Sequence, residues 1–208
     1  NPAPEPIIKS VGESITITAN ANLSANMKLF FNGTQIAAQN GVSSITANAV
    51  ITTGGPQLIS AEANDGITGR FDSMSFFVSA PPVVAPVPAG LRDGINYEPG
   101  DTSATLVFFA PGKSAVFVLG DFNNWTQDQK FQMANSPDGN RHWVRITGLT
   151  PGTEYAYQFL VDNALKVADY FTEKVLAPVN DPFISPLTYP GLKAYPVGKT
   201  TGIVSILQ

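Results

Sequence analysis

The sequence has no cysteine and a single histidine, His142, among its 208 residues. These two scarcities exclude a cysteine nucleophile, a thiolate metal site and a metal site built from several histidines. A serine–histidine triad would have one candidate base, and the sequence offers no G-x-S-x-G elbow to use it. We therefore expect His142 to be solvated or to form a surface hydrogen bond, and we predict no catalytic residue, cofactor or metal ligand.

Charged residues are also scarce, at 13%, and 16 acidic residues against 12 basic ones give a net charge of −4. No cluster of Lys and Arg is present to neutralise phosphates, which argues against a nucleic-acid partner. No apolar run approaches the roughly 18 residues of a membrane span. The lack of cysteine fits a reducing compartment and equally fits many exported bacterial proteins, so by itself it does not indicate the compartment.

Short alternating segments separated by turn residues fill most of the chain. In Ser14–Asn20, Ile15 and Ile17 alternate with threonines, which is the pattern of a strand with one buried face. Asn32-Gly33 is a typical tight hairpin turn. No segment keeps a helical period over three turns, so we predict an all-β fold with two immunoglobulin-like β-sandwich domains in tandem. We expect six strands in the first domain: Ser14–Asn20, Met27–Phe31, Gln35–Ala38, Ser44–Thr52, Gln57–Asn64 and Phe71–Ser79.

A proline-rich stretch indicates where one domain ends and the next begins. The stretch APPVVAPVPAG carries no charge and no hydrophobic period, so we expect an extended, semi-rigid linker there. The predicted organisation is a first sandwich at 1–80, the linker at 81–90, a second sandwich at 91–178 and a Pro-rich extension at 179–208.

The second domain has five predicted strands: Ser103–Phe109, Ser114–Leu119, Trp143–Ile146, Glu154–Val161 and Leu165–Ala168. The apolar tail Gly202–Gln208 also has strand character. Either it completes a sheet in this chain or it begins a further domain, and a Pro-rich spacer before a fresh strand favours the second alternative.

The motif Gly120–Trp125 (GDFNNW) directly follows a predicted strand. Its glycine and polar residues suit a tight loop, and Phe122 is expected to plug the core. Trp125 could present a flat ring to the C–H face of a sugar, with the amides of Asn123 and Asn124 taking hydroxyls. Alternatively, Trp125 packs under its own loop as an anchor.

Three elements in order, GDFNNW, Gly148–Asn163 (GLTPGTEYAYQFLVDN) and Ala168–Lys174 (ADYFTEK), carry a family resemblance. The region 91–178 resembles carbohydrate-binding module family 48, an early-set immunoglobulin-like domain. It occurs ahead of the catalytic barrel of many glycoside hydrolase family 13 enzymes, in glycogen branching enzymes and isoamylases, and in the beta subunit of AMP-activated protein kinase. The resemblance implies starch or glycogen as the ligand.

The resemblance also implies a three-part sugar platform, from which this chain departs. Trp125 is kept, Gln158 replaces the usual lysine, and Leu165 replaces a second tryptophan. The carbohydrate-binding residues that we predict are therefore Trp125, Asn123, Asn124, Gln158 and Leu165. In the D-P-Y-like segment the proline is missing, and we expect Asp169 to end a strand and Tyr170 to cover the sandwich edge.

The whole arrangement, including the exit Thr188–Gly202, resembles the N-terminal half of exported α-amylase-type enzymes of Bacteroidetes. The chain lacks the barrel motifs of family 13 and the length of about 250 residues that a barrel needs. We therefore predict non-catalytic modules of a secreted bacterial α-amylase-like enzyme, extracellular, cell-surface or periplasmic. The predicted partners are an α-glucan and a catalytic barrel further along the same protein.

Two alternatives remain open at this stage. The segment Ile146–Tyr157 (ITGLTPGTEYAY) mimics a fibronectin III corner, which would indicate spacer or adhesion modules. A surface glycan-binding protein without a barrel is the other alternative.

Overall fold

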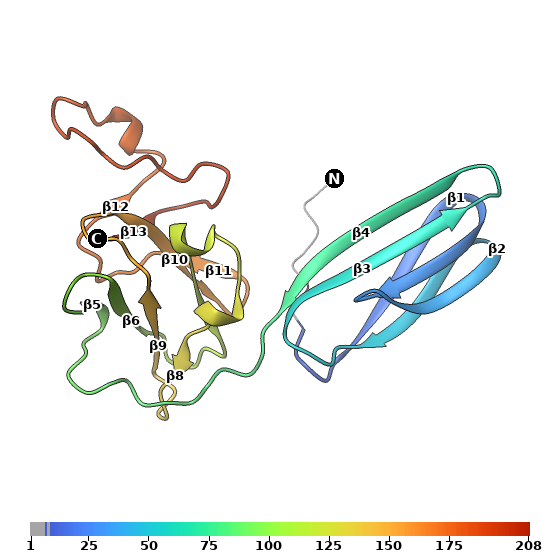
Figure 1. Cartoon of the computed structure of the whole chain (residues 1–208), viewed down its shortest axis with the longest axis horizontal. Helices are drawn as coiled ribbons and strands as arrows, with labels where there is room; N and C mark the ends of the chain where they lie inside the picture. The colour runs from blue at the N-terminus through green and yellow to red at the C-terminus, as the bar shows by residue number, and fades with distance from the viewer. Residues whose placement is uncertain (1–6, 8) are drawn as a thin grey trace. The chain divides into compact units, whose positions relative to one another are not determined.

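In the computed structural model, which describes residue 7 and residues 9–208, the chain divides into two compact units (Figure 1). Unit 1 is residues 1–80 and unit 2 is residues 81–208. Regular structure is almost entirely strand, which confirms the all-β prediction. Among the described residues, no helix has the length and apolar character that a bilayer crossing requires.

Unit 1 consists of one antiparallel sheet in the order β2-β1-β3-β4. Its strands are β1 (Ser14–Phe31), β2 (Thr34–Val50), β3 (Gly55–Asn64) and β4 (Gly69–Val78). The prediction of six short strands is wrong, because β1 and β2 each join two of them into one long strand. The pairing of β1 with β2 shifts register between Asn20 and Ala25, and such irregularities let a continuous strand bend.

The bent sheet of unit 1 folds back on itself. The first half of β1 pairs with β2 alone, whereas its second half pairs with both β2 and β3. As a result, Ile15 and Ile17 from the first half share one core with Leu29 and Ile59. The outer face of the same hairpin is polar, where Thr16 donates a hydrogen bond to Asn48 at 2.7 Å.

Unit 2 is a two-sheet sandwich. One sheet has the order β5-β6-β9-β8; in the other, β10 pairs with β7 on one edge and with β11 and β13 on the other, and β12 pairs with β13. The strands are β5 (Gly94–Tyr97), β6 (Ser103–Phe109), β7 (Val116–Gly120), β8 (Ala134–Asn135), β9 (Arg141–Thr147), β10 (Tyr155–Val161), β11 (Leu165–Val167), β12 (Val175–Leu176) and β13 (Val204–Leu207). Three short 3₁₀ helices join them: η1 (Asp121–Asn123), η2 (Gln129–Phe131) and η3 (Asp181–Phe183).

Aromatic and branched side chains from both sheets fill the core of unit 2. Phe159 stacks on Phe108 with ring centroids 4.3 Å apart and meets Tyr157 edge-on at 5.7 Å. His142 also lies inside, and its Nε2 is 3.2 Å from the carbonyl oxygen of Ala110. The expectation that His142 is solvated or at the surface is wrong, because β9 places it on the inner side of the fold. Burial lowers the pKa of the imidazole, which favours its neutral form.

The proline-rich stretch 81–90 contributes to unit 2. Val84 forms a parallel bridge with Asn135, and the N–H of Ala85 donates to the carbonyl oxygen of Asn135 at 2.9 Å. The carbonyl oxygen of Ala85 also accepts a hydrogen bond from the indole of Trp143. The stretch therefore lies along the edge of a sheet, a position where proline is tolerated.

The C-terminal tail pairs within this chain. β13 pairs with β10 on one side and with β12 on the other. Of the two alternatives for Gly202–Gln208, the structure has the one in which the tail completes a sheet. The favoured alternative, a strand that begins a further domain, is wrong for this segment.

Candidate functional site

The GDFNNW motif forms a loop whose polar side chains bond to its own backbone. The amide oxygen of Asn123 accepts from the N–H of Gly120 at 2.9 Å, and its amide nitrogen donates to the carbonyl of Val118 at 2.8 Å. Gly120 is required for steric reasons, because a Cβ there would lie 2.7 Å from the carbonyl oxygen of Ala156. Asn123 therefore stabilises the turn between β7 and η1.

Trp125 is buried against its own loop. Asn124 and Trp125 both have positive φ, at 52° and 61°, which is a costly conformation for a bulky residue. The indole N–H donates to a carboxylate oxygen of Asp121 at 2.9 Å, and the residue is only 8% exposed. Of the two roles left open for Trp125, its geometry is that of packing, because no broad ring face is offered to solvent.

Asp121 joins the loop to two other segments. Its second oxygen accepts from the N–H of Ala156 at 2.9 Å and pairs with the ammonium of Lys193 at 3.0 Å. Burial raises the pKa of Asp121, but the hydrogen bonds from Ala156, Trp125 and Lys193 outweigh it and lower the pKa overall. Asp121 thus remains ionised and holds the motif against both β10 and the segment before β13.

Gln158 is buried beneath that same segment, at 1% exposed. Its amide nitrogen donates to the carbonyl oxygens of Thr201 and Ile203 at 3.0 and 2.6 Å, and its amide oxygen accepts from Thr200. All of these partners belong to the backbone or side chains of residues 200–203. Gln158 therefore anchors this segment and does not reach solvent, so it is not available as a sugar ligand in this arrangement.

The motif loop, β11 and the segment before β13 also carry exposed side chains. We define the candidate glucan face as the exposed residues Asn124, Leu165, Lys166, Lys199 and Thr201. Lys199 donates to the side-chain oxygen of Asn124 at 2.9 Å although the two lie far apart in sequence. Lys166 lies 3.4 Å from the hydroxyl of Thr200, and Leu165 is 58% exposed.

Of the five residues predicted from the sequence, two lie on this face, Asn124 and Leu165, whereas Asn123, Trp125 and Gln158 support it from behind. The sequence did not predict Lys166, Lys199 or Thr201. Lys199 and Thr201 fall in the stretch expected to be an extension, and no periodicity marks them. The described residues contain no cluster of three or more acidic, histidine or cysteine side chains that could hold a metal ion.

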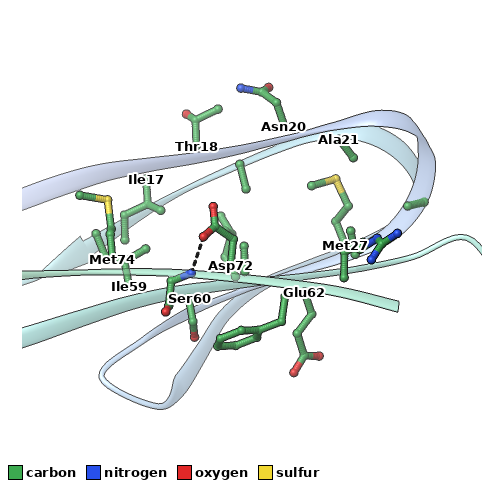
Figure 2. A pocket seen from close by; sticks show the side chains of 18 of the residues that line it. Ile17, Thr18, Asn20, Ala21, Met27, Ile59, Ser60, Glu62, Asp72 and Met74 are labelled. Atoms are coloured by element: carbon green, nitrogen blue, oxygen red, sulfur yellow. Dashed lines mark hydrogen bonds between the residues drawn. The ribbon is translucent and has the colours of Figure 1, made fainter. Parts of the chain in front are cut away.

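A separate cavity of about 860 Å³ lies in unit 1, between the first half of β1 and the strands β3 and β4 (Figure 2). Ile17, Met27 and Ile59 form apolar walls. Figure 2 shows the carboxylate of Asp72 directed into this space from β4, whereas Thr18 points away from it. The cavity marks the place where the folded-over sheet of unit 1 does not cover its own inner face.

Comparison with known families gives one match. Residues 103–175 match the model of the glycogen recognition site of AMP-activated protein kinase. This range runs from β6 to the start of β12 and contains the GDFNNW loop. No curated protein matches the chain.

Solved structures of several kinds resemble the chain distantly. They include a Group B Streptococcus pullulanase in complex with maltotetraose (9% identity, TM-score 0.33, 80% of this chain and 23% of that one). Others are a pullulanase from Anoxybacillus (13%, 0.32, 81% and 25%) and fibronectin(III)-like modules from Clostridium thermocellum (12%, 0.32, 79% and 87%). The chain spans about a quarter of the length of the pullulanases.

Proposed function

We propose that unit 2 is a non-catalytic module that binds α-glucan, and that it serves a starch- or glycogen-active enzyme. The observation that carries this proposal is the match of residues 103–175 to a glycogen recognition model. The fold supports it, because β10 contacts the motif loop, β11 and residues 199–203 and so brings them together. Those three segments supply every residue of the candidate glucan face.

The chemistry of this face suits sugar hydroxyls. The ammonium groups of Lys166 and Lys199 are donors, the side chains of Asn124 and Thr201 can donate and accept, and Leu165 supplies an apolar contact. No aromatic ring belongs to the face. Binding here would therefore rest on hydrogen bonds in water, each of which contributes a modest net free energy.

The parent protein in this proposal is a secreted bacterial α-amylase-like enzyme of glycoside hydrolase family 13, whose barrel lies elsewhere in the protein. The supporting features are the sequence resemblance and the lack, within the chain, of the histidines and carboxylate motifs that such an active site needs.

Affinity electrophoresis of the 208-residue protein in gels containing amylopectin tests the proposal. We expect retarded migration of the wild type, weaker retardation of Lys199→Ala, and stronger retardation of Leu165→Trp. A new ring at position 165 should lower the apparent Kd about two- to thirteenfold, which corresponds to an aromatic contact of about 0.5–1.5 kcal/mol.

The matched control is Val50→Trp, which adds a ring at a 56% exposed position in unit 1 and should leave migration unchanged. Gels with hydroxyethylcellulose, a β-linked glucan, test the linkage. Unretarded migration of the wild type in amylopectin would contradict the proposed function.

A further inference from the structure

Half-exposed aromatic rings gather in unit 2 away from the candidate glucan face. Phe109 is 42% exposed, Tyr170 57% and Phe171 53%. Tyr170 and Phe171 have ring centroids 4.9 Å apart, and the Tyr170 hydroxyl donates to the carbonyl oxygen of Phe109 at 2.7 Å. Together with the neighbouring ion pair of Asp93 and Arg141, we call these five residues the aromatic surface.

The rings of the aromatic surface are held in place from below. Asp169 is buried; its backbone N–H donates to the hydroxyl of Ser205 at 2.7 Å, and its carboxylate accepts from the Tyr157 hydroxyl at 2.8 Å and from the N–H of Phe171 at 2.9 Å. Phe171 also packs closely on Gly94, where a Cβ would come within 2.6 Å of the Phe171 Cβ. Because the rings are fixed before any ligand arrives, binding would cost little conformational entropy.

Polar groups lie directly beside these rings. Arg141 makes a two-point contact with Asp93, at 2.6 and 3.2 Å, and its guanidinium lies 5.3 Å from the centroid of Phe109. Both side chains remain partly accessible. Their remaining N–H groups and lone pairs can donate to and accept from hydroxyls, next to ring surfaces that suit C–H groups.

We propose that the aromatic surface binds an α-glucan chain and supplies the ring stacking that the candidate glucan face lacks. This inference rests on the proposed function, because it names where that glucan is contacted. Sugar is favoured over a protein partner because the rings lie among fixed polar groups, the Arg141 guanidinium over Phe109 and the Tyr170 hydroxyl, which matches a ligand with alternating C–H faces and hydroxyls. Four of the five residues, all except Asp93, also fall within the range that matches the glycogen recognition model.

The test compares ring-deletion variants of the full chain in amylopectin gels and in titrations with maltoheptaose. Phe171→Ala should weaken binding at least threefold, and so should Phe171→Leu, which keeps apolar volume but removes the ring. The matched control is Phe183→Ala, which deletes a ring that is 87% exposed and outside the aromatic surface, and it should bind like the wild type. Tryptophan fluorescence during thermal unfolding checks that each variant of unit 2 is folded.

The outcomes separate the two proposals. If Phe171→Ala and Phe171→Leu bind like the wild type while Lys199→Ala is weakened, the aromatic surface is not a glucan site and the proposed function stands. If Phe171→Leu binds like the wild type and Phe171→Ala does not, packing explains the loss and the stacking role is wrong. If the wild type binds no glucan, both proposals fail.

Discussion

The two units enclose their cores to different degrees although both are built from antiparallel strands. In unit 2, two sheets cover each other, and Phe108, Tyr157 and Phe159 fill the space between them. In unit 1, one sheet bends over itself, and a cavity remains where β3 and β4 are not covered. An inner face without a packing partner lacks the contacts that stabilise a closed interior, so we expect unit 1 to be the less tightly packed of the two.

The largest expected difference concerns loss of a core side chain. Phe159→Ala should destabilise unit 2 by about 3–5 kcal/mol, because its ring contacts other rings on two sides and a closed sandwich cannot collapse into the gap. Met27→Ala in unit 1 should cost only about 2 kcal/mol, since Met27 already borders the open cavity.

Hydrogen exchange measured by mass spectrometry distinguishes the two, because peptides from each unit report separately. Tryptophan fluorescence adds a second readout for unit 2 alone, since Trp125 and Trp143 are the only tryptophans and both belong to it. If Phe159→Ala and Met27→Ala lost the same free energy of unfolding, the cavity would not reduce the cost of removing a side chain from unit 1.

A smaller difference is expected when side chains are enlarged. Ala61→Leu, on the cavity wall of unit 1, should stabilise the protein by about 0.5–2 kcal/mol, because the added carbons fill empty space. Ala104→Leu, at a fully buried position in unit 2, should destabilise it by about 1–3 kcal/mol through overpacking. Chemical denaturation of both variants gives the two signs directly, and a loss of stability in Ala61→Leu would contradict the cavity described for unit 1.

Hydrophobic periodicity predicted the strands of unit 2 better than those of unit 1. The predicted strand Glu154–Val161 is confirmed as β10, which carries Tyr157 and Phe159 into the core of unit 2. The same reasoning divided β1 into two strands, because local pattern cannot show that Asn20 and Ala25 lie in a bulged continuation of one strand. The bend of β1, and with it the way unit 1 folds over itself, was therefore not predicted.

The candidate site was only partly predictable, for a physical reason. The GDFNNW motif identified the correct loop, but Trp125 is held inward by Asp121 of the same motif, and Asp121 is in turn paired with Lys193, which is distant in sequence. Likewise, the resemblance predicts Gln158 as a sugar-binding residue, but residues 200–203 cover it and take up its hydrogen bonds. Contacts between a strand and a segment remote in sequence leave no pattern in the local sequence of the strand.

The smallest expected difference between the units is in their response to acid. In unit 2, the hydrogen bond from Arg145 lowers the pKa of Glu98 from 4.5 to about 2, and the hydrogen bond from Ser136 lowers that of Asp138 from 3.8 to about 2. Because the unfolded chain takes up these protons first, their stabilisation is complete above the usual pKa and is lost as the pH falls towards 2. Both carboxylates are exposed, so solvent screens the effect.

His142 and Asp169 modify this acid response in opposite directions. Burial lowers the pKa of His142, so its neutral form supports stability that is lost as the pH falls below 6.5. Burial raises the pKa of Asp169, so that group instead costs stability as the pH rises above 3.8. His142, Glu98 and Asp138 lose stability on acidification and Asp169 opposes them, so we expect the unfolding midpoint of unit 2, followed by tryptophan fluorescence, to fall as the pH is lowered from 6.5 to 2.

Glu98→Gln removes one titrating group from unit 2 and keeps the size of the side chain. The variant should flatten the dependence between pH 4.5 and 2, since that window is the interval between the usual and the native pKa of Glu98. Asp65→Asn is the matched control in unit 1, where the N–H groups of Thr68 and Ile67 lower the pKa of an exposed carboxylate. It should leave the fluorescence midpoint of unit 2 unchanged at every pH. An unchanged slope in Glu98→Gln would mean that the Arg145 contact is as strong in the unfolded chain as in the folded one.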